Sequence, residues 1–251
     1  MIAKKLVMLC DYGLDDAIAT ARILENREKF GSIDIVAVGG NVPTATSLKN
    51  ARTLLAQYKN LQGVRIVNTC ALPQPEETLF DIHGSDGMGG VFEPKNGNIP
   101  EILFGDWINE YDGDCLLLSL GPMTITKLLI EKAKPSRFVF MAGCVNAQPN
   151  YNGYEFNHGM DPEAFAFCVK FPHEGVLLDT ASPVLLLKEA NEGSPVRVAL
   201  QQAYLKLEWH NGEDAYVWDD IAARFILYPE QFTIKRLTDK WKNNLNCIFY
   251  K

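Results

Sequence analysis

The fold follows from one stretch near the N-terminus, Lys5-Leu6-Val7-Met8-Leu9-Cys10-Asp11-Tyr12-Gly13-Leu14-Asp15-Asp16-Ala17. Its apolar run predicts a buried strand, and the alanine- and isoleucine-rich residues after Gly13 predict the helix that returns along the sheet. The carboxylates of Asp11, Asp15 and Asp16 therefore lie at the C-terminal end of a strand. Open α/β sheets bind their ligands at this end.

Three carboxylates within six residues repel one another, so this turn requires either full solvation or a neutralising cation. Helix capping is the alternative interpretation. In it Asp15 is the N-cap and Asp16 interacts with the positive end of the helix dipole. Capping leaves Asp11 without an explanation.

The composition describes an acidic protein with a large core. The chain has 251 residues, of which 47% are hydrophobic, and a formal net charge of −7. We therefore expect no nucleic acid and no anionic membrane among its partners. No linker rich in Pro, Gly and Ser divides the chain, so we expect one domain over residues 1–251.

The sequence also predicts a cytoplasmic location. The N-terminal apolar run is too short for a signal peptide, and no run reaches the length of a membrane span. The six cysteines, at positions 10, 70, 115, 144, 168 and 247, are widely spaced without a CxxC pair. They are therefore expected to be reduced, buried thiols rather than disulfides or zinc ligands.

Strand-like and helix-like segments alternate along the chain. Apolar runs predict strands at 33–38, 64–67, 115–120, 138–142 and 176–178, and helical spacing occurs at 47–58, 123–134 and 162–169. This alternation predicts a doubly wound α/β fold with a mostly parallel sheet. The loop over residues 72–100 is the longest Gly- and Pro-rich section, and loops of that length in compact domains are usually functional.

Polar blocks follow the predicted strands. They are Gly39-Gly40-Asn41-Val42, His83-Gly84 with Asp86-Gly87-Met88-Gly89, Gly121-Pro122-Met123-Thr124, Glu155-Phe156-Asn157 and Asp161-Pro162-Glu163-Ala164. Asp161 followed by Pro162 predicts an N-cap and the first residue of a helix. Trp218-Asp219-Asp220 predicts a further acidic helix start. If the strands are parallel, these blocks meet at one edge of the sheet.

Together with the Asp11 to Ala17 stretch, these blocks resemble in order those of the inosine-uridine nucleoside hydrolase family, over residues 4–228. The resemblance implies a single doubly wound α/β domain with a Rossmann-like core. It also implies calcium-dependent hydrolysis of the N-glycosidic bond of ribonucleosides, which releases base and ribose. A small-molecule nucleoside would be the substrate, and a homodimer or homotetramer the assembly.

The resemblance also implies roles for single residues. The calcium ligands would be Asp11, Asp16, Asp219 and the backbone carbonyl of Leu120, and oxygen ligands suit this hard cation. Asp11 would in addition be the general base that takes a proton from water. The implied substrate-binding residues are Asp15, Asn41, Asn157, Glu155, Asn150, His83 and Trp218. Of these, Asp15, Asn41 and Asn157 would lie near the secondary hydroxyls of ribose, and Glu155 and Asn150 near its 5′ side.

Two departures from the family pattern bear on the activity. Leu9 stands where the family often has an acid, and Trp218 stands where some members have a histidine that protonates the departing base. The chain therefore lacks that proton donor, although a tryptophan ring can stack on a base. The alternative function is a catalytically weak or inactive homologue that binds nucleoside or ribose.

Overall fold

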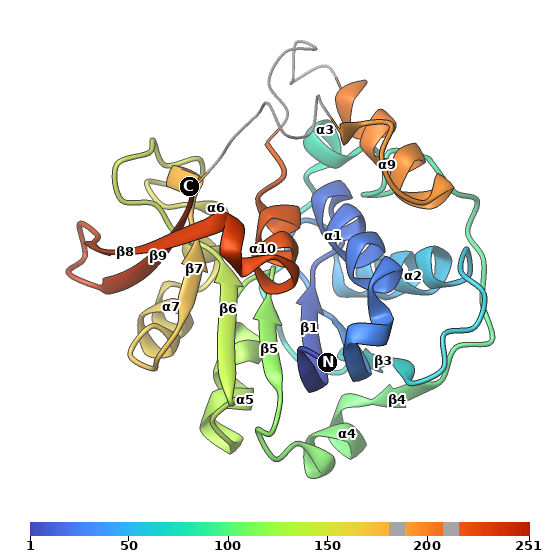
Figure 1. Ribbon diagram of the computed structural model, residues 1–251, viewed down its shortest axis with the longest axis horizontal. Coiled ribbons are helices and arrows are strands. Elements are labelled where there is room, and N and C mark those ends of the chain that lie inside the picture. The colour runs from blue at the N-terminus through green and yellow to red at the C-terminus, as the bar shows by residue number, and fades with distance from the viewer. Residues whose placement is uncertain (181–188, 208–215) are drawn as a thin grey trace.

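The computed structural model describes residues 1–180, 189–207 and 216–251. Within these residues, nine strands form one sheet in the order β4-β3-β2-β1-β5-β6-β7-β9-β8 (Figure 1). The strands are β1 (Ala3–Cys10), β2 (Phe30–Ala37), β3 (Val64–Asn68), β4 (Glu101–Leu103), β5 (Leu116–Ser119), β6 (Arg137–Met141), β7 (Glu174–Val176), β8 (Phe232–Thr238) and β9 (Asn244–Tyr250).

Helices connect these strands and cover both faces of the sheet (Figure 1). The α-helices are α1 (Leu14–Glu25), α2 (Thr44–Leu55), α3 (Phe80–His83), α4 (Phe104–Glu110), α5 (Thr124–Lys132), α6 (Phe156–Met160), α7 (Pro162–Cys168), α9 (Pro195–Leu205) and α10 (Trp218–Leu227). Short 3₁₀ turns are η1 (Arg27–Lys29), η2 (Leu178–Thr180) and η4 (Pro229–Gln231).

The predicted α/β class with a mostly parallel sheet is confirmed. Neighbouring strands from β4 through β7 to β9 are parallel, and β8 alone runs antiparallel to its neighbour β9. The reason is local: a tight turn joins β8 directly to β9, and a short connection can only produce an antiparallel pair. No strand was predicted after residue 178, and both β8 and β9 lie beyond it.

Most predicted segments lie where expected, with ends displaced by a few residues. The strand predicted at 176–178 is misplaced along the chain, because β7 covers Glu174–Val176 and ends where the prediction begins. There the Thr180 hydroxyl accepts a hydrogen bond from the Leu177 amide, and the Thr180 amide donates to the Leu177 carbonyl. This closes a turn that the apolar side chains alone do not reveal. The helix that was predicted to begin at Pro162 does so, with Asp161 as its N-cap.

The sheet separates two apolar layers. Alternate residues of β1 face opposite sides: Leu6, Met8 and Cys10 pack with α1, α2, α9 and α10, whereas Val7 and Leu9 pack with α4, α5 and α7. Burying each such side chain contributes about 1.5–3 kcal/mol. β1 is therefore fixed from both sides, and the turn that follows it has a rigid base.

The order in which successive strands are added to the sheet switches sides at β1. Strands β2, β3 and β4 are added on one side, and the chain then crosses over to place β5 on the other side of β1. At such a switch point the loops after the two strands separate and leave a crevice at their carboxyl ends. The blocks that follow β1, β2 and β5 therefore meet at one edge of the sheet.

The described residues also settle two smaller points. All six cysteines are free, and Cys70 is the exposed one. None of the described helices combines the length and the apolar character that a membrane crossing requires.

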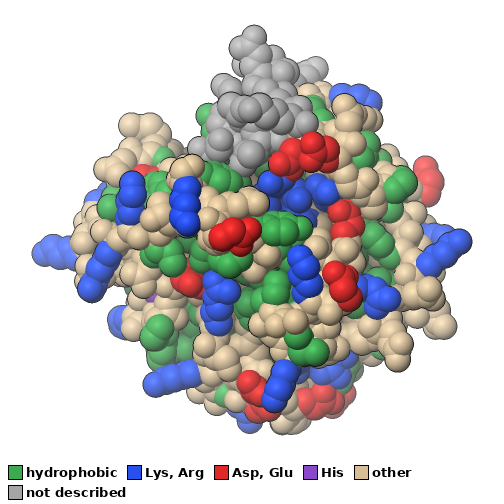
Figure 2. All heavy atoms as spheres, viewed as in Figure 1, with side chains coloured by type: hydrophobic (Ala, Val, Ile, Leu, Met, Phe, Trp, Pro, Cys, Tyr) green, Lys and Arg blue, Asp and Glu red, His purple; other side chains and the backbone are tan. Residues whose placement is uncertain are grey.

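Figure 2 shows lysine and arginine side chains spread over one face of the molecule with acidic side chains between them.

Candidate active site

The turn after β1 is held by Asp16. This residue is the third of helix α1, and its carboxylate accepts hydrogen bonds from the Gly13 amide at 2.9 Å and from the Asp11 amide at 3.2 Å. The N-cap position belongs to Gly13. The interpretation of Asp15 as the N-cap was therefore wrong, because the Asp16 side chain reaches back to satisfy the amide at the helix start.

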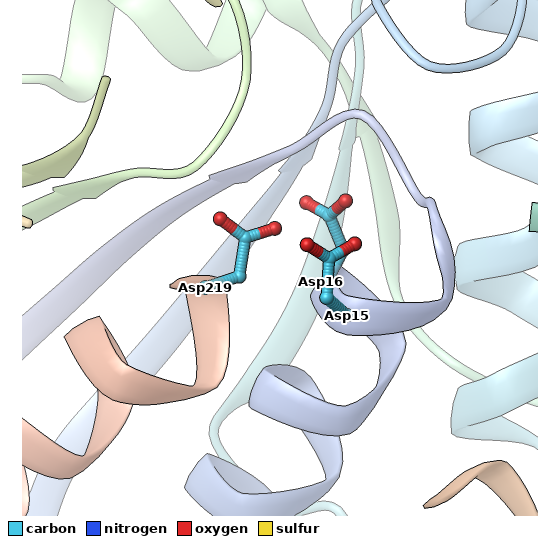
Figure 3. Close-up of side chains that lie close together, drawn as sticks. All are labelled: Asp15, Asp16 and Asp219. Carbon is cyan, nitrogen blue, oxygen red and sulfur yellow. The ribbon is translucent and has the colours of Figure 1, made fainter. Parts of the chain in front are cut away.

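Asp15, Asp16 and Asp219 form a buried acidic cluster. Each offers a carboxylate oxygen that lies within 4.8 Å of the others, and the three carboxylates lie side by side above the first turns of α1 and α10 (Figure 3). Burial raises the pKa of Asp15 to about 6 and that of Asp16 and Asp219 well above the usual range. Repulsion from neighbouring carboxylates adds to the effect, from within the cluster for Asp16 and Asp219 and from Asp220 and Glu155 for Asp15. Among the described residues, no lysine or arginine forms an ion pair with these carboxylates.

Asp11 lies beside this cluster and faces Asn41. The Asn41 amide donates to Oδ2 of Asp11 at 2.8 Å, and the Asn41 side chain donates to Oδ1 at 3.0 Å. Burial raises the pKa of Asp11 to about 7, although the hydrogen bonds it accepts oppose the increase. A Cβ atom at Gly40 would overlap Oδ2 of Asp11, so only glycine leaves room for the carboxylate.

A buried ion pair places Asp219 against helix α1. The next residue, Asp220, accepts two hydrogen bonds from Arg22 of α1, at 2.5 and 2.7 Å, and a third from Arg224 at 3.1 Å. Planar bidentate pairs of this kind fix orientation as well as distance. The first turn of α10 is thereby held beside the first turn of α1, and this brings Asp219 to Asp15 and Asp16.

Asn157 connects the ends of β5 and β6. Its Nδ2 donates to the Leu120 carbonyl at 2.7 Å and to the Met141 carbonyl at 3.1 Å. Its Oδ1 is buried without a hydrogen-bond partner among the described residues. A buried acceptor without a donor is costly, so this oxygen is suited to accept from a bound ligand.

Glu155 is the N-cap of α6. Its carboxylate accepts hydrogen bonds from the amides of Gly143 at 2.6 Å, Asn157 at 2.9 Å and His158 at 3.0 Å. Burial raises its pKa, and these three donors oppose that increase. Glu155 is therefore firmly oriented, and it lines the same cavity as Asn157.

His83, at the end of α3, covers the start of α1. Its Nδ1 accepts a hydrogen bond from the Leu14 amide at 3.1 Å and lies 3.9 Å from Oδ1 of Asp15. A ring nitrogen that accepts from an amide carries no proton, so the imidazole is neutral with its proton on Nε2. The side chain is buried and packs close to Gly13.

These groups surround one cavity of about 440 Å³. Its polar side includes Asp15, Asn41, Asn150, Glu155, Asn157 and Asp219, together with Leu120. Tyr216 and Trp218 line the same cavity, and their rings stack with centroids 5.0 Å apart and an interplanar angle of 13°. Tyr204 donates its hydroxyl proton to the Tyr216 carbonyl at 2.6 Å and lines the cavity with them. The cavity thus joins a polar floor to an aromatic wall.

Comparison with known proteins identifies the family. The model of the inosine-uridine preferring nucleoside hydrolases matches residues 6–242. The chain belongs to this family. Among curated relatives, the probable uridine nucleosidase 1 of rice is 25% identical, over 92% of this chain and 79% of that one. A pyrimidine-specific ribonucleoside hydrolase of Escherichia coli O139:H28 is 26% identical, over 92% and 82%.

Solved structures agree with the fold of this nucleoside hydrolase. The purine-preferring ribonucleoside hydrolase from Gardnerella vaginalis aligns with a TM-score of 0.76 at 20% identity, over 99% of this chain and 88% of that one. An inosine-guanosine nucleoside hydrolase aligns at 0.70 and 22%, over 97% and 87%. The predicted family and the prediction of an enzyme that hydrolyses the N-glycosidic bond of nucleosides are thus confirmed.

The family is metal-dependent, and the donor set of this nucleoside hydrolase fits a divalent cation. All the side-chain donors are carboxylate oxygens, and Oδ1 of Asp15 is buried without a hydrogen-bond partner among the described residues. The grouping differs in one respect from the predicted ligand set. Asp15 rather than Asp11 groups with Asp16 and Asp219, and the carboxylate of Asp11 lies beside them, hydrogen-bonded to Asn41.

The structure brings nearly all the predicted site residues of this nucleoside hydrolase to one cavity. Asp11 and Asp16 are fully buried and do not line it themselves. Sequence reasoning missed Tyr204 and Tyr216. The one signal available for Tyr216 was a second aromatic residue two positions before Trp218.

Proposed function

We propose that this nucleoside hydrolase cleaves ribonucleosides to base and ribose with Ca²⁺ held at the acidic cluster. We further propose that Asp11 is the general base. The supporting observation is a single cavity that is lined both by buried carboxylates and amides and by aromatic rings. Such a cavity offers a polyol-binding side and a base-stacking side at the same time.

The ribose would bind at the polar floor. The Asp15 carboxylate and the unpaired Oδ1 of Asn157 would accept hydrogen bonds from its secondary hydroxyls, and the Asn41 side chain would also lie near them. Glu155 and Asn150 would face its 5′ side. The carboxylates also stabilise the positive charge that develops on the sugar in the transition state as the base departs. The polar floor therefore serves both binding and the transition state.

The cation would be held between Asp16 and Asp219, which belong both to the acidic cluster and to the predicted ligand set. Asp11 and the Leu120 carbonyl would complete the predicted set, and the unpaired Oδ1 of Asp15 lies beside it. Calcium accepts such an irregular oxygen set more readily than magnesium, which requires near-ideal octahedral geometry. When bound, the cation supplies Lewis acidity that lowers the pKa of the attacking water. Asp11 removes the proton, and its hydrogen bonds from Asn41 fix the direction of its carboxylate.

The leaving base would stack against Trp218, which cannot donate a proton to a ring nitrogen as histidine does. Stacking contributes about 0.5–1.5 kcal/mol beyond burial, whereas loss of a general acid costs about 10²-fold in rate. Bases that depart without protonation should therefore be preferred. If another acid serves the base, His83 is the first residue to test, because it lines the cavity.

A reducing-sugar assay tests the proposal. Inosine, uridine, p-nitrophenyl riboside and a cationic N-riboside are each incubated with chelator-treated protein, with and without added calcium. Ribose release that depends on calcium is expected. Calorimetric binding of nucleoside with no ribose release from any of the four would instead establish a binding homologue.

We also propose that the chain acts as a single domain within a cytoplasmic homodimer or homotetramer. The family to which the chain belongs supports this assembly. Light scattering of the purified protein is expected to give two or four times the mass of the chain. A monomer at micromolar concentration would contradict the proposed assembly.

A further inference from the structure

One segment of the chain, residues 150–158, carries much of the cavity wall. Asn150, Tyr151, Glu155 and Asn157 all line the cavity from it. The segment begins with a tight turn in which Tyr151 and Tyr154 form a β-bridge, with two residues of positive φ between them. The turn leads directly into Glu155, so the position of the turn affects the polar floor.

A second turn lies against this segment, at the end of the C-terminal hairpin. Asp239, between β8 and β9, accepts hydrogen bonds from the amides of Trp241 at 3.0 Å and Asn243 at 2.8 Å. The Asn243 side chain donates to the same carboxylate at 2.9 Å. Since one buried carboxylate organises the whole turn, the turn presents Trp241 in a fixed direction.

Trp241 contacts the 150–158 segment through its ring. It stacks on Tyr154 with centroids 4.3 Å apart and planes 5° from parallel, and it meets the edge of His158 at 4.6 Å. Lys240 donates to the Gly153 carbonyl at 2.7 Å. The hairpin turn therefore holds the segment at residues on both sides of Glu155.

We propose that Trp241 is a positioning residue, which holds the 150–158 segment so that Asn150 and Glu155 meet the 5′ side of the substrate. The proposal rests on the proposed function, in which these two residues face the 5′-hydroxyl. Trp241 does not line the cavity, so its effect on the substrate is transmitted through Tyr154 and His158. The C-terminal hairpin thus becomes part of the substrate-recognition apparatus.

The test compares Trp241→Ala with Trp241→Phe, which keeps an aromatic ring, and with Lys235→Ala. Lys235 lies on the same hairpin, is exposed and has its ammonium group over Phe249, so it controls for damage to the hairpin itself. Two quantities are measured: amide hydrogen exchange of residues 150–158, and kcat and KM for uridine and 5′-deoxyuridine. The metal-loaded full chain is used throughout.

We expect Trp241→Ala to speed exchange in residues 150–158 at least tenfold and to raise KM for uridine about tenfold, the usual value of one well-placed hydrogen bond. KM for 5′-deoxyuridine should change less than threefold. Trp241→Phe should keep both the exchange rates and the KM for uridine close to the wild-type values. Lys235→Ala should change neither quantity.

Unchanged exchange in Trp241→Ala would overturn the proposal. So would equal losses for uridine and 5′-deoxyuridine, because a general weakening of the fold does not distinguish the 5′-hydroxyl. Failure of the proposed function would look different, since the wild-type protein would then release no ribose. In that case the exchange measurement alone decides whether Trp241 positions the segment.

Discussion

Removal of the divalent cation should make the stability of this protein fall as pH rises. Asp11 has a pKa of about 7 in the folded chain against 3.8 for an ordinary aspartate, and Asp15 has about 6. One pKa unit corresponds to about 1.4 kcal/mol, so Asp11 alone accounts for about 4 kcal/mol and Asp15 for about 3 kcal/mol. The carboxylates titrate together, so these contributions do not simply add.

The sign follows from the protons that each state binds. Between pH 3.8 and about 7 the folded chain keeps a proton on Asp11 that the unfolded chain has released, so the free energy of unfolding falls as pH rises through this range. Bound calcium would stabilise the ionised carboxylates, so with calcium the free energy of unfolding should no longer fall as pH rises through this range. At pH 8, 4 kcal/mol corresponds to about 10 °C in Tm for a domain of this size.

Scanning calorimetry at pH 5, 6, 7 and 8, with either chelator or calcium, measures the effect. The quantity to compare is the Tm gained from calcium at each pH. His158 and His173 have lowered pKa values that add a pH dependence of their own, and this contribution cancels in the comparison. The gain should grow from pH 5 to pH 8, and Asp11→Asn should reduce its growth. A gain that stays level or shrinks would refute the reasoning.

Three further predictions concern single side chains. Asp11→Asn should lower kcat for uridine at least ~10²-fold in a ribose-release assay, and near-normal turnover would place the general base elsewhere. Trp218→His should raise the inosine rate relative to p-nitrophenyl riboside; an unchanged ratio would show that the leaving base needs no acid at this position. Arg22→Met should destabilise the fold by on the order of 3 kcal/mol in urea titrations and weaken calcium binding, because it releases the helix that carries Asp219. Arg197→Met, which removes a buried ion pair away from α10, should destabilise without this loss of calcium affinity.

The helix starts show how far local pattern reasoning extends. The sequence predicted α7 with Asp161 as its N-cap and an acidic start to α10, because these signals depend on neighbouring residues alone. The alternative interpretation of the first acidic stretch, in which Asp15 was the N-cap of α1, was wrong. Asp15 and Asp16 are equally suited to a first helical turn, and the choice was made by the hydrogen bond from Gly13 to Asp16.

Local sequence patterns account for the alternation of strands and helices, and with it for the place of Asp11, Asp15 and Asp16 at a strand end, because side-chain periods of two and 3.6 residues are local properties. The groups that these acids contact depend on long-range packing. The order of strands placed Leu120 beside them at the switch between β1 and β5, and the Arg22–Asp220 pair brought Asp219 from a distant helix. Such contacts depend on the packing of segments far apart in the chain, and no local pattern encodes them.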